Sequence, residues 1–325
     1  MKKKKIYFIL IFIPLILTIF SCSKKNPGGS IQEGWDAENG KIKVLSTIAM
    51  IDNIVSEIGG DKIDHLCLIV GEIDPHSYEL VKGDDEKITR ADLVFFNGLG
   101  LEHGASLKYH LDNHLASLGV GDYLLATAKE KLLFNEGQVD PHIWMDMELF
   151  SLIIDPIVEE LVKKDPEHTT FFQSNGEILK KKLLDTDRVL FKKMQLIPPE
   201  KRYLITSHDA FHYFTKRYLA TPGEIDGKWK MRCSAPEGLA PDGQMSVLDI
   251  QRVCDFLCEH RISFVFPESN VSRHSLQKIV SVCLEKGHNV KVAETPLFGD
   301  TMGSKTYIQM IEYNIETLFY YFSEN

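Results

Sequence analysis

The feature that most constrains the fold is a long helical segment near the middle of this 325-residue chain. Between Pro166 and Ile197 there is no further proline and a single glycine, Gly176. Apolar side chains recur there at helical spacing among many lysines, at Phe172, Ile178, Leu179, Leu183, Leu184, Val189, Leu190 and Met194. The pattern predicts one helix of roughly 30 residues, longer than most globular helices, which the following prolines end. A helix of that length is typical of a rigid link between two lobes.

Short runs rich in β-branched residues alternate with helical periodicity on both sides of this segment. Strands are expected over 42–45, 63–70, 93–96, 203–206, 262–266 and 290–293, and helices over 49–58, 150–163, 247–260, 272–286 and 307–322. Strand followed by helix is the order that builds parallel sheets covered by helices. We therefore predict an α/β protein of two (β/α) lobes with parallel sheets, over 41–165 and 198–325, joined by one rigid linking helix over 166–197.

The N-terminus has the pattern of an export signal. Four consecutive lysines, beginning at Lys2, precede an apolar run over 6–20 that is interrupted by Pro14 and Thr18. Spanning a membrane usually takes about 20 apolar residues, so this shorter run is better explained as a signal peptide. We expect the signal peptide to cover 1–21 and to be absent from the mature fold.

The end of this signal resembles a bacterial lipobox. Ile-Phe-Ser-Cys over 19–22 would place a lipid on Cys22, which would then be the first residue of the mature protein. The alternative is a plain secretory signal, with Cys22 unmodified. The polar, glycine-containing stretch over 22–40 predicts a flexible tether between the membrane and the folded domain.

Charge and cysteine content exclude two other classes of protein. The net charge of −9 argues against nucleic acid as a partner, because neutralising phosphates needs a basic face. Besides Cys22 there are five cysteines, an odd number that does not predict a disulfide framework. Cys254 and Cys258 lie on the apolar stripe of a predicted helix, where they would be small buried hydrophobes, while a pair that includes Cys233 stays open.

Three of the twelve histidines share a context that suits metal binding. His76 ends the turn Asp74-Pro75-His76 after a predicted strand, and Asp140-Pro141-His142 repeats that turn before a predicted helix. Ser207-His208-Asp209 follows another predicted strand. Ligands gather at the carboxyl ends of strands in open α/β sheets, and the Asp two residues before His76 and before His142 could orient the imidazole or cap the turn. The structural alternative is that both Asp-Pro-His turns only cap the chain.

Asp300 completes this candidate set, since it follows the last predicted strand. Three imidazoles and one carboxylate, contributed in equal pairs by the two lobes, suit a divalent transition metal. His212, four residues after His208, is expected to face solvent or to support a ligand from behind. His103 could approach the cleft, but the simpler prediction is that it starts a surface helix.

These residues resemble a known family, the solute-binding lipoproteins of metal ABC importers (the TroA and ZnuA family). The resemblance covers nearly all of the mature domain and lies in the segments over 74–79, 97–102, 140–146 and 207–214, followed by Asp300, Tyr307 and Asn314. Within the family, the runs over 76–85 and 229–238 look most like the iron-linked YtgA branch.

The resemblance implies both an architecture and a function. The metal would lie between the two lobes, held by His76, His142, His208 and Asp300. The protein would be a monomeric, lipid-anchored receptor outside the cytoplasmic membrane that hands one iron, manganese or zinc ion to a cognate ABC permease. It would not be an enzyme.

Two departures from the family pattern leave the metal open. The stretch over 115–139 lacks the histidines that zinc-dedicated members often carry there, and His208 stands where manganese members typically have Glu. Two other functions also stay open. An exported zinc hydrolase would use three ligands and a base, for which Glu268 is the candidate, and an adhesin-like lipoprotein would use the same fold as a display surface.

Overall fold

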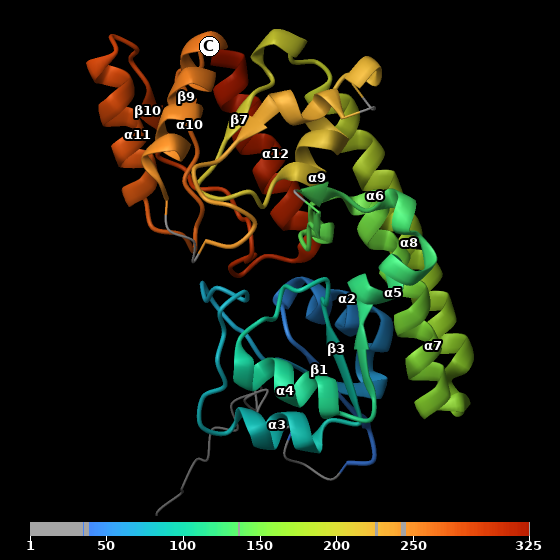
Figure 1. The fold of residues 1–325 in the computed structure, drawn as a ribbon. Helices are drawn as coiled ribbons and strands as arrows, with labels where there is room; N and C mark the ends of the chain where they lie inside the picture. Colours follow the sequence, from blue (N-terminus) through green and yellow to red (C-terminus); the bar gives the residue numbers. More distant parts are fainter. Residues whose placement is uncertain (1–34, 36–38, 136, 225–226, 242–244, 325) are drawn as a thin grey trace, which may run out of the picture.

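The structure is a computed structural model that describes residues 35, 39–135, 137–224, 227–241 and 245–324. The predicted signal peptide and Cys22 lie outside these residues, as does most of the predicted tether. The described chain forms two lobes with a layer of helices along one side (Figure 1). None of the helices in these ranges is long and apolar enough to cross a membrane.

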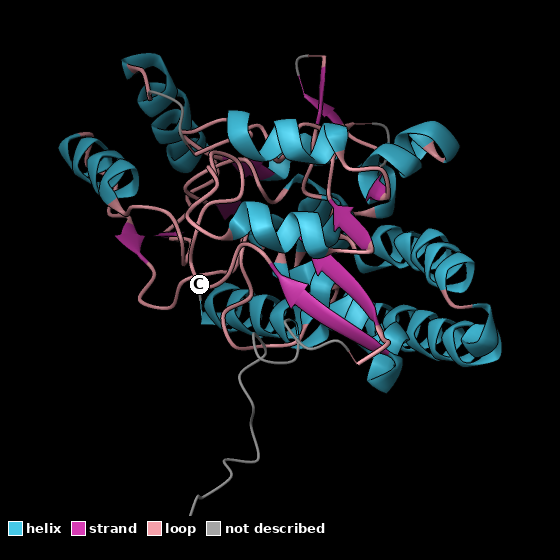
Figure 2. Ribbon diagram, turned by 90° about the horizontal axis from the view of Figure 1, so that it is seen from below, coloured by secondary structure: helices cyan, strands magenta, loops and turns pink. Residues whose placement is uncertain are grey.

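The first lobe is built on a parallel sheet of four strands. These are β1 (Ile42–Ser46), β2 (Ile63–Cys67), β3 (Leu93–Phe96) and β4 (Ser117–Gly119), in the order β2-β1-β3-β4. The register places Val44 beside both His65 and Leu93. The connecting helices are α2 (Ala49–Gly59), α3 (Asp84–Arg90), α4 (Ala105–Asn113) and α5 (Val120–Thr127). Figure 2 shows helices on both faces of this sheet, in keeping with the mostly buried, mainly apolar residues of the two central strands, β1 and β3.

The second lobe has shorter strands in two parallel pairs. β7 (Leu204–Ile205) pairs with β8 (Cys233–Ser234), and β9 (Phe264–Val265) pairs with β10 (Lys291–Val292). The Phe266 amide donates to the Ile205 carbonyl at 2.7 Å, so the two pairs lie side by side in one layer. The helices are α10 (Val247–Glu259), α11 (His274–Glu285) and α12 (Tyr307–Glu324).

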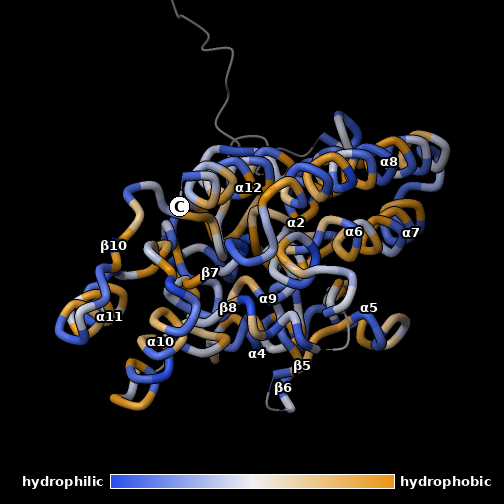
Figure 3. The backbone as a smooth tube through the Cα atoms, turned by 90° about the horizontal axis from the view of Figure 1, so that it is seen from above, coloured by the Kyte–Doolittle hydropathy of each residue, from blue (hydrophilic) through white to orange (hydrophobic). Residues whose placement is uncertain are grey.

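The linking helix is α8 (Thr169–Met194), which lies within the predicted segment. It packs against α7 (Ile154–Lys164), and a Cβ on Gly176 would come within 2.7 Å of Val158 Cγ2, so glycine permits the close approach. Hydrophobic and hydrophilic residues alternate along α8 in Figure 3, as expected for a helix with one buried face.

Hydrogen bonds fix each end of α8 to a different lobe. Near its start, the side-chain amide of Asn175 donates from Nδ2 to the Ile58 carbonyl at 3.0 Å. Near its end, the buried Asp187 carboxylate accepts from Arg217 Nε at 3.0 Å and from the Tyr218 hydroxyl at 2.9 Å. The helix is therefore anchored to both lobes, as a rigid link requires.

The remaining elements are short. β5 (Phe134–Asn135) and β6 (Gln138–Val139) form an antiparallel pair, and α6 (Met147–Phe150), α9 (His212–Phe214) and a π-helix (Thr215–Leu219) lie near the junction of the lobes. Short 3-10 helices lie at Gly60–Lys62, Lys129–Lys131, Ile143–Met145, Ser151–Ile153, Pro166–His168, Pro199–Lys201, Pro222–Glu224 and Lys228–Arg232.

Two findings modify the sequence predictions away from the site. Trp35 lies in the segment predicted to be a tether, yet its side chain is only 1% exposed and packs in the main apolar core. At this residue the chain belongs to the fold. Cys254 is fully buried in a second apolar cluster between α10 and α11, as predicted, whereas Cys258 is only half-buried. The five cysteines that the structure describes, Cys233 included, are free thiols.

Candidate metal centre

The four predicted ligands come together at the junction of the two lobes. One donor atom from each of His76, His142, His208 and Asp300 lies within 4.8 Å of all the others, and all four side chains are buried. The Nε2 atoms of His76 and His142 are 3.2 Å apart. Asp300 Oδ1 lies 3.4 Å from His142 Nε2, and Asp300 Oδ2 lies 3.2 Å from His208 Nε2 and 3.8 Å from His76 Nε2.

His76 comes from the irregular segment between β2 and α3. The side chain of Asp74 accepts from the His76 amide at 2.9 Å and from the Ser77 hydroxyl at 2.7 Å, which forms the turn predicted from Asp-Pro-His. These bonds hold the backbone, while the imidazole of His76 points its Nε2 at the other clustered residues.

His142 is held through both its backbone and its ring. Asp140 Oδ1 accepts from the His142 amide at 3.0 Å and lies 2.7 Å from His142 Nδ1. A proton on Nδ1 leaves the lone pair of Nε2 directed at the centre. Both roles suggested for this aspartate, capping the turn and orienting the imidazole, are therefore present.

The loop that carries His142 forms hydrogen bonds with both lobes, although the predicted boundary at residue 165 assigns this loop to the first lobe. Asn97 of the first lobe donates to the Pro141 carbonyl at 3.0 Å, and the Tyr213 hydroxyl of the second donates to the Asp140 carbonyl at 3.1 Å. Beyond the site, Trp144 Nε1 donates to the Gly299 carbonyl at 2.8 Å, which fixes this loop against the one that carries Asp300.

His208 follows β7 and is oriented by Glu268, which follows β9. One oxygen of Glu268 accepts from the amides of Ser207 at 3.0 Å and His208 at 2.9 Å, and the other lies 2.8 Å from His208 Nδ1. Glu268 was considered only as the base of a hydrolase. Its position at the carboxyl end of a strand was the signal that could have indicated this supporting role.

Asp300 is a buried carboxylate whose oxygens face the Nε2 atoms of His76, His142 and His208. Both of its oxygens are inaccessible, and neither has a hydrogen-bond partner among the described residues. A buried charge in this state is costly unless a cation faces it. Although burial alone would raise it, the surrounding imidazoles, His208 first, hold the pKa of Asp300 well below its usual range.

The histidines differ in how they bind protons. Burial would lower the pKa of His142, but the Asp140 and Asp300 carboxylates overcome this and raise the pKa to about 9. Glu268 and Asp300 likewise outweigh burial and raise the pKa of His208 well above its usual value. Burial dominates at His76 and lowers its pKa to about 3. The centre therefore attracts positive charge on its His142 and His208 side.

The two histidines left uncertain by the sequence lie next to the centre. His212 Nδ1 is 2.9 Å from Asp140 Oδ2, so it supports His142 from behind, in agreement with its predicted role. His103 is exposed just before α4, as predicted, but its ring also lies 6.0 Å from the ring of His76.

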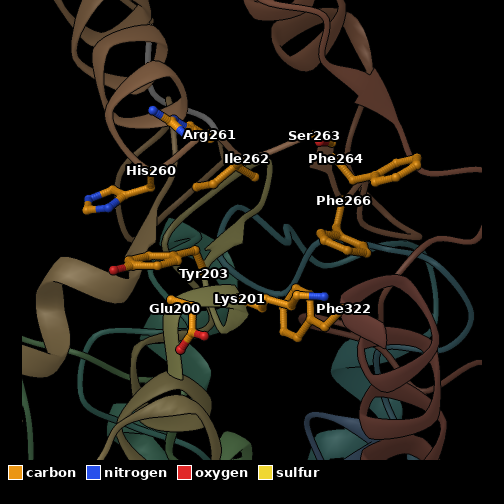
Figure 4. Close-up of a pocket in the computed structure, with 10 residues that line it drawn as sticks. All are labelled: Glu200, Lys201, Tyr203, His260, Arg261, Ile262, Ser263, Phe264, Phe266 and Phe322. Atoms are coloured by element: carbon orange, nitrogen blue, oxygen red, sulfur yellow. The ribbon is translucent and has the colours of Figure 1, made fainter. Parts of the chain in front are cut away.

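Histidines line several cavities among the described residues, and one of these, with His110 and His114, lies beside α3 and α4 and contains none of the four clustered residues. Two others also contain histidines. One of about 470 Å³ is lined by His76 and His103 and by residues of both lobes, including Val139 and Leu239, so it opens onto the centre. The other, of about 180 Å³, lies in the second lobe between the start of β9 and the end of α12 (Figure 4). It is lined by His260 and aromatic side chains and contains none of the four clustered residues.

Comparisons with known proteins agree with this architecture. The family model for ZnuA, "Zinc-uptake complex component A periplasmic", matches residues 44–319. The metal-binding protein YtgA of Chlamydia muridarum is 39% identical over 301 residues, which cover 92% of this chain and 90% of that protein.

Two solved structures share the fold. The crystal structure of Fe(III)-bound YtgA from Chlamydia trachomatis matches with a TM-score of 0.83 and 37% identity, over 87% of this chain and 98% of that one. The periplasmic zinc-binding protein TroA from Treponema pallidum matches with a TM-score of 0.78 and 28% identity, over 87% and 99%. The predicted α/β fold of two lobes and a linking helix is confirmed, and the chain belongs to the ZnuA family of zinc-uptake complex component A proteins.

Proposed function

We propose that this protein is the extracytoplasmic receptor of an ABC importer for a transition metal, and that His76, His142, His208 and Asp300 bind the ion. One observation carries the proposal. The buried Asp300 carboxylate has no hydrogen bond among the described residues and faces three imidazole Nε2 atoms. A cation bound to these four atoms would satisfy the carboxylate and all three lone pairs at once.

The donor set narrows the choice of cargo. Three imidazoles and one carboxylate suit divalent zinc, iron or manganese, and the described cysteines lie outside the cluster, which disfavours a soft ion such as Cu(I). The similar YtgA structure is Fe(III)-bound and TroA is named as zinc-binding. Iron is therefore the first cargo to test, with zinc and manganese as the alternatives.

The proposed mechanism is coordination without chemical turnover. Asp140 and Glu268 keep the Nε2 atoms of His142 and His208 directed at the ion, so binding displaces protons rather than rearranging the site. Movement of the lobes or loops at the permease would then separate ligands that come from different segments and release the ion.

The contacts of Glu268, the candidate base of a hydrolase, argue against the hydrolase alternative. Glu268 is buried and contacts His208 Nδ1 and two backbone amides, so its carboxylate is already used to hold a ligand. Four protein ligands would also occupy the position that a catalytic zinc keeps for water. The relatives named above are metal-binding proteins, in keeping with a receptor.

Export and anchoring belong to the same proposal. The signal over 1–21 would direct the chain across the cytoplasmic membrane, and a lipid on Cys22 would keep the monomeric receptor near its permease. The family description as periplasmic supports a location outside the cytoplasm. Mass spectrometry of the mature N-terminus distinguishes a lipidated Cys22 from a plain cleavage.

Elemental analysis of protein purified without added metal, followed by competition among Fe(II), Fe(III), Mn(II) and Zn(II), tests the function. We expect one ion per chain. Asp300→Asn should weaken binding by more than about 100-fold, the upper end of the loss when only a ligand's support is removed. Asp255→Asn, which changes an exposed carboxylate of α10, should bind like the wild type. A chain that binds none of these ions, or an Asp300→Asn variant with unchanged affinity, would refute the proposal.

A further inference from the structure

Segments that support three of the four clustered residues meet at Gly299. The next residue in the chain is Asp300. The Gly299 carbonyl accepts from Trp144 Nε1 at 2.8 Å, in the loop that follows the second Asp-Pro-His turn. Glu268, which lies beside His208 Nδ1, occupies the space where a side chain of residue 299 would begin. A change at this one position can therefore reach most of the centre without altering a clustered residue.

Contact, and not backbone conformation, requires a glycine at position 299. The φ of Gly299 lies outside the left-handed region, so the backbone itself would accept an alanine. A Cβ at this position would lie 2.2 Å from Glu268 Oε2 and 3.5 Å from His208 Cε1. The second distance is an ordinary van der Waals contact, whereas the first is a clash. The steric conflict is therefore with the Glu268 carboxylate.

The Glu268 carboxylate cannot move aside and still support His208. Its residue is only 2% exposed. Oε1 accepts from the amides of Ser207 at 3.0 Å and His208 at 2.9 Å. Oε2, the atom that a Cβ on residue 299 would meet, is the oxygen that lies 2.8 Å from His208 Nδ1. A methyl group at this position would therefore displace the oxygen that orients the imidazole.

The effect of such a methyl group should fall on the site and not on the fold. The atom in conflict is at the end of a side chain, so rotation of Glu268 relieves the clash while the backbone of Gly299 and its bond to Trp144 stay in place. Losing the group that orients a metal-binding imidazole typically weakens metal affinity by about 10- to 100-fold.

We propose that Gly299 is a positioning residue of the metal centre: because it has no side chain, it leaves the space in which Glu268 Oε2 orients the imidazole of His208. The inference rests on the proposed function, because it requires the four-residue centre to bind metal. Gly299 acts through Glu268 and does not itself bind the ion.

Gly299→Ala, with Zn²⁺ as the probe, tests this assignment. Kd, measured by chelator competition, should rise by about 10- to 100-fold. A crystal structure of the metal-free variant should show the Glu268 carboxylate turned away from His208 Nδ1. Gly238→Ala is the matched control. Gly238 is exposed in the same lobe, its φ also lies outside the left-handed region, and a Cβ there would meet no described atom within 4 Å, so this variant should bind Zn²⁺ like the wild type.

A double-mutant cycle separates this role from a general packing defect. In Glu268→Ala the oxygen that Gly299→Ala would displace is absent. Adding Gly299→Ala to Glu268→Ala should therefore change Kd by no more than about twofold, the scatter expected of substitutions that do not interact. If Gly299→Ala alone did not fold, the double variant should fold, because the clash has been removed.

The outcomes distinguish this inference from the function on which it rests. A wild type that binds one ion, together with an unchanged Kd in Gly299→Ala, would overturn the positioning role alone. A loss of equal size with and without Glu268 would also overturn it, as would a Glu268 carboxylate that stays beside His208 Nδ1 in the variant's structure. If the wild type itself bound no Zn²⁺, Fe(II) or Mn(II), the proposed function and this inference would both fail.

Discussion

His142 and His208 occupy one side of the centre and His76 the other, and the two sides are built differently. Buried carboxylates lie 2.7 Å from His142 Nδ1 and 2.8 Å from His208 Nδ1. In the part of the chain that the structure describes, no carboxylate lies against Nδ1 of His76, and Asp74 holds only its backbone. The inner side, defined by His142 and His208, is therefore oriented and electronegative, while the outer side, defined by His76 and the cavity that it lines, is neutral.

This difference suggests a division of labour within one site. Carboxylates that orient imidazoles favour tight binding, because they fix the lone pairs and stabilise positive charge. An imidazole without such a partner can reorient at lower cost, which suits exchange with solvent. We expect affinity to depend mainly on the inner side and the rate of exchange mainly on the outer side.

The largest effect expected from a substitution in this comparison is the difference in metal affinity between variants of the two aspartates in the repeated Asp-Pro-His turn. Asp140→Asn removes the charge behind His142 and should weaken metal affinity by about 10- to 100-fold. Asp74→Asn should stay within about threefold of the wild type, because an asparagine side chain can still accept the turn hydrogen bonds. Competition against a chelator measures both constants. Equal losses in the two variants would show that the sides do not differ in this respect.

Apart from substitutions, the inner side also imposes a pH dependence on metal affinity. The pKa of His142 is raised to about 9, so lowering the pH below that value protonates His142 in the metal-free protein. The proton must leave when the ion binds, and each displaced proton weakens the apparent affinity by about tenfold per pH unit. His76, with its pKa lowered to about 3, adds no such dependence in this range.

Affinity should therefore fall continuously as the pH drops from about 9, rather than only near the ordinary imidazole value of about 6.5. Titrating the metal affinity of the wild type between pH 9.5 and 5.5 provides the measurement. In Asp140→Asn the fall should begin at lower pH, because the carboxylate that raises the pKa of His142 is gone. A wild-type affinity that is flat across this interval would contradict the charge assigned to the inner side.

Much of this arrangement could be predicted from local patterns. The linking helix was expected over 166–197 and is α8 (Thr169–Met194), since apolar spacing and the flanking prolines are properties of the segment itself. The four clustered residues could be proposed because each follows a strand or ends an Asp-Pro-His turn. Each of these signals is local, because the residues that form it lie close together in the sequence.

Contacts between distant segments were not predictable in this way. Glu268 supports His208 across 60 positions, and no periodicity connects the two residues. Trp35 looked like part of a polar tether because its burial depends on a core formed by residues far along the chain. The β5–β6 hairpin was missed because two-residue strands leave no alternating pattern, yet the Lys230 side chain of the second lobe bonds its Phe134 carbonyl at 3.2 Å.

The smallest expected effect concerns a hydrogen bond that closes the outer side. Thr301, next to Asp300, donates to Glu72 Oε2 at 2.7 Å, and Glu72 belongs to the same irregular segment as His76. Thr301→Val keeps the shape of the side chain but loses this link between the lobes. A hydrogen bond of about 1 kcal/mol corresponds to a change of roughly fivefold, so Zn²⁺ release into chelator should become about fivefold faster.

The direction of this change is what makes it informative. Ser269→Ala is the matched control, because it removes the 2.9 Å contact between Ser269 and Thr301 while leaving the bond to Glu72 in place, and it should release Zn²⁺ at the wild-type rate. Thr301→Val should speed release, because the lost hydrogen bond is the one that joins the loop of Asp300 to the segment that carries His76. Faster release in Ser269→Ala than in Thr301→Val would instead place the restraint within the second lobe.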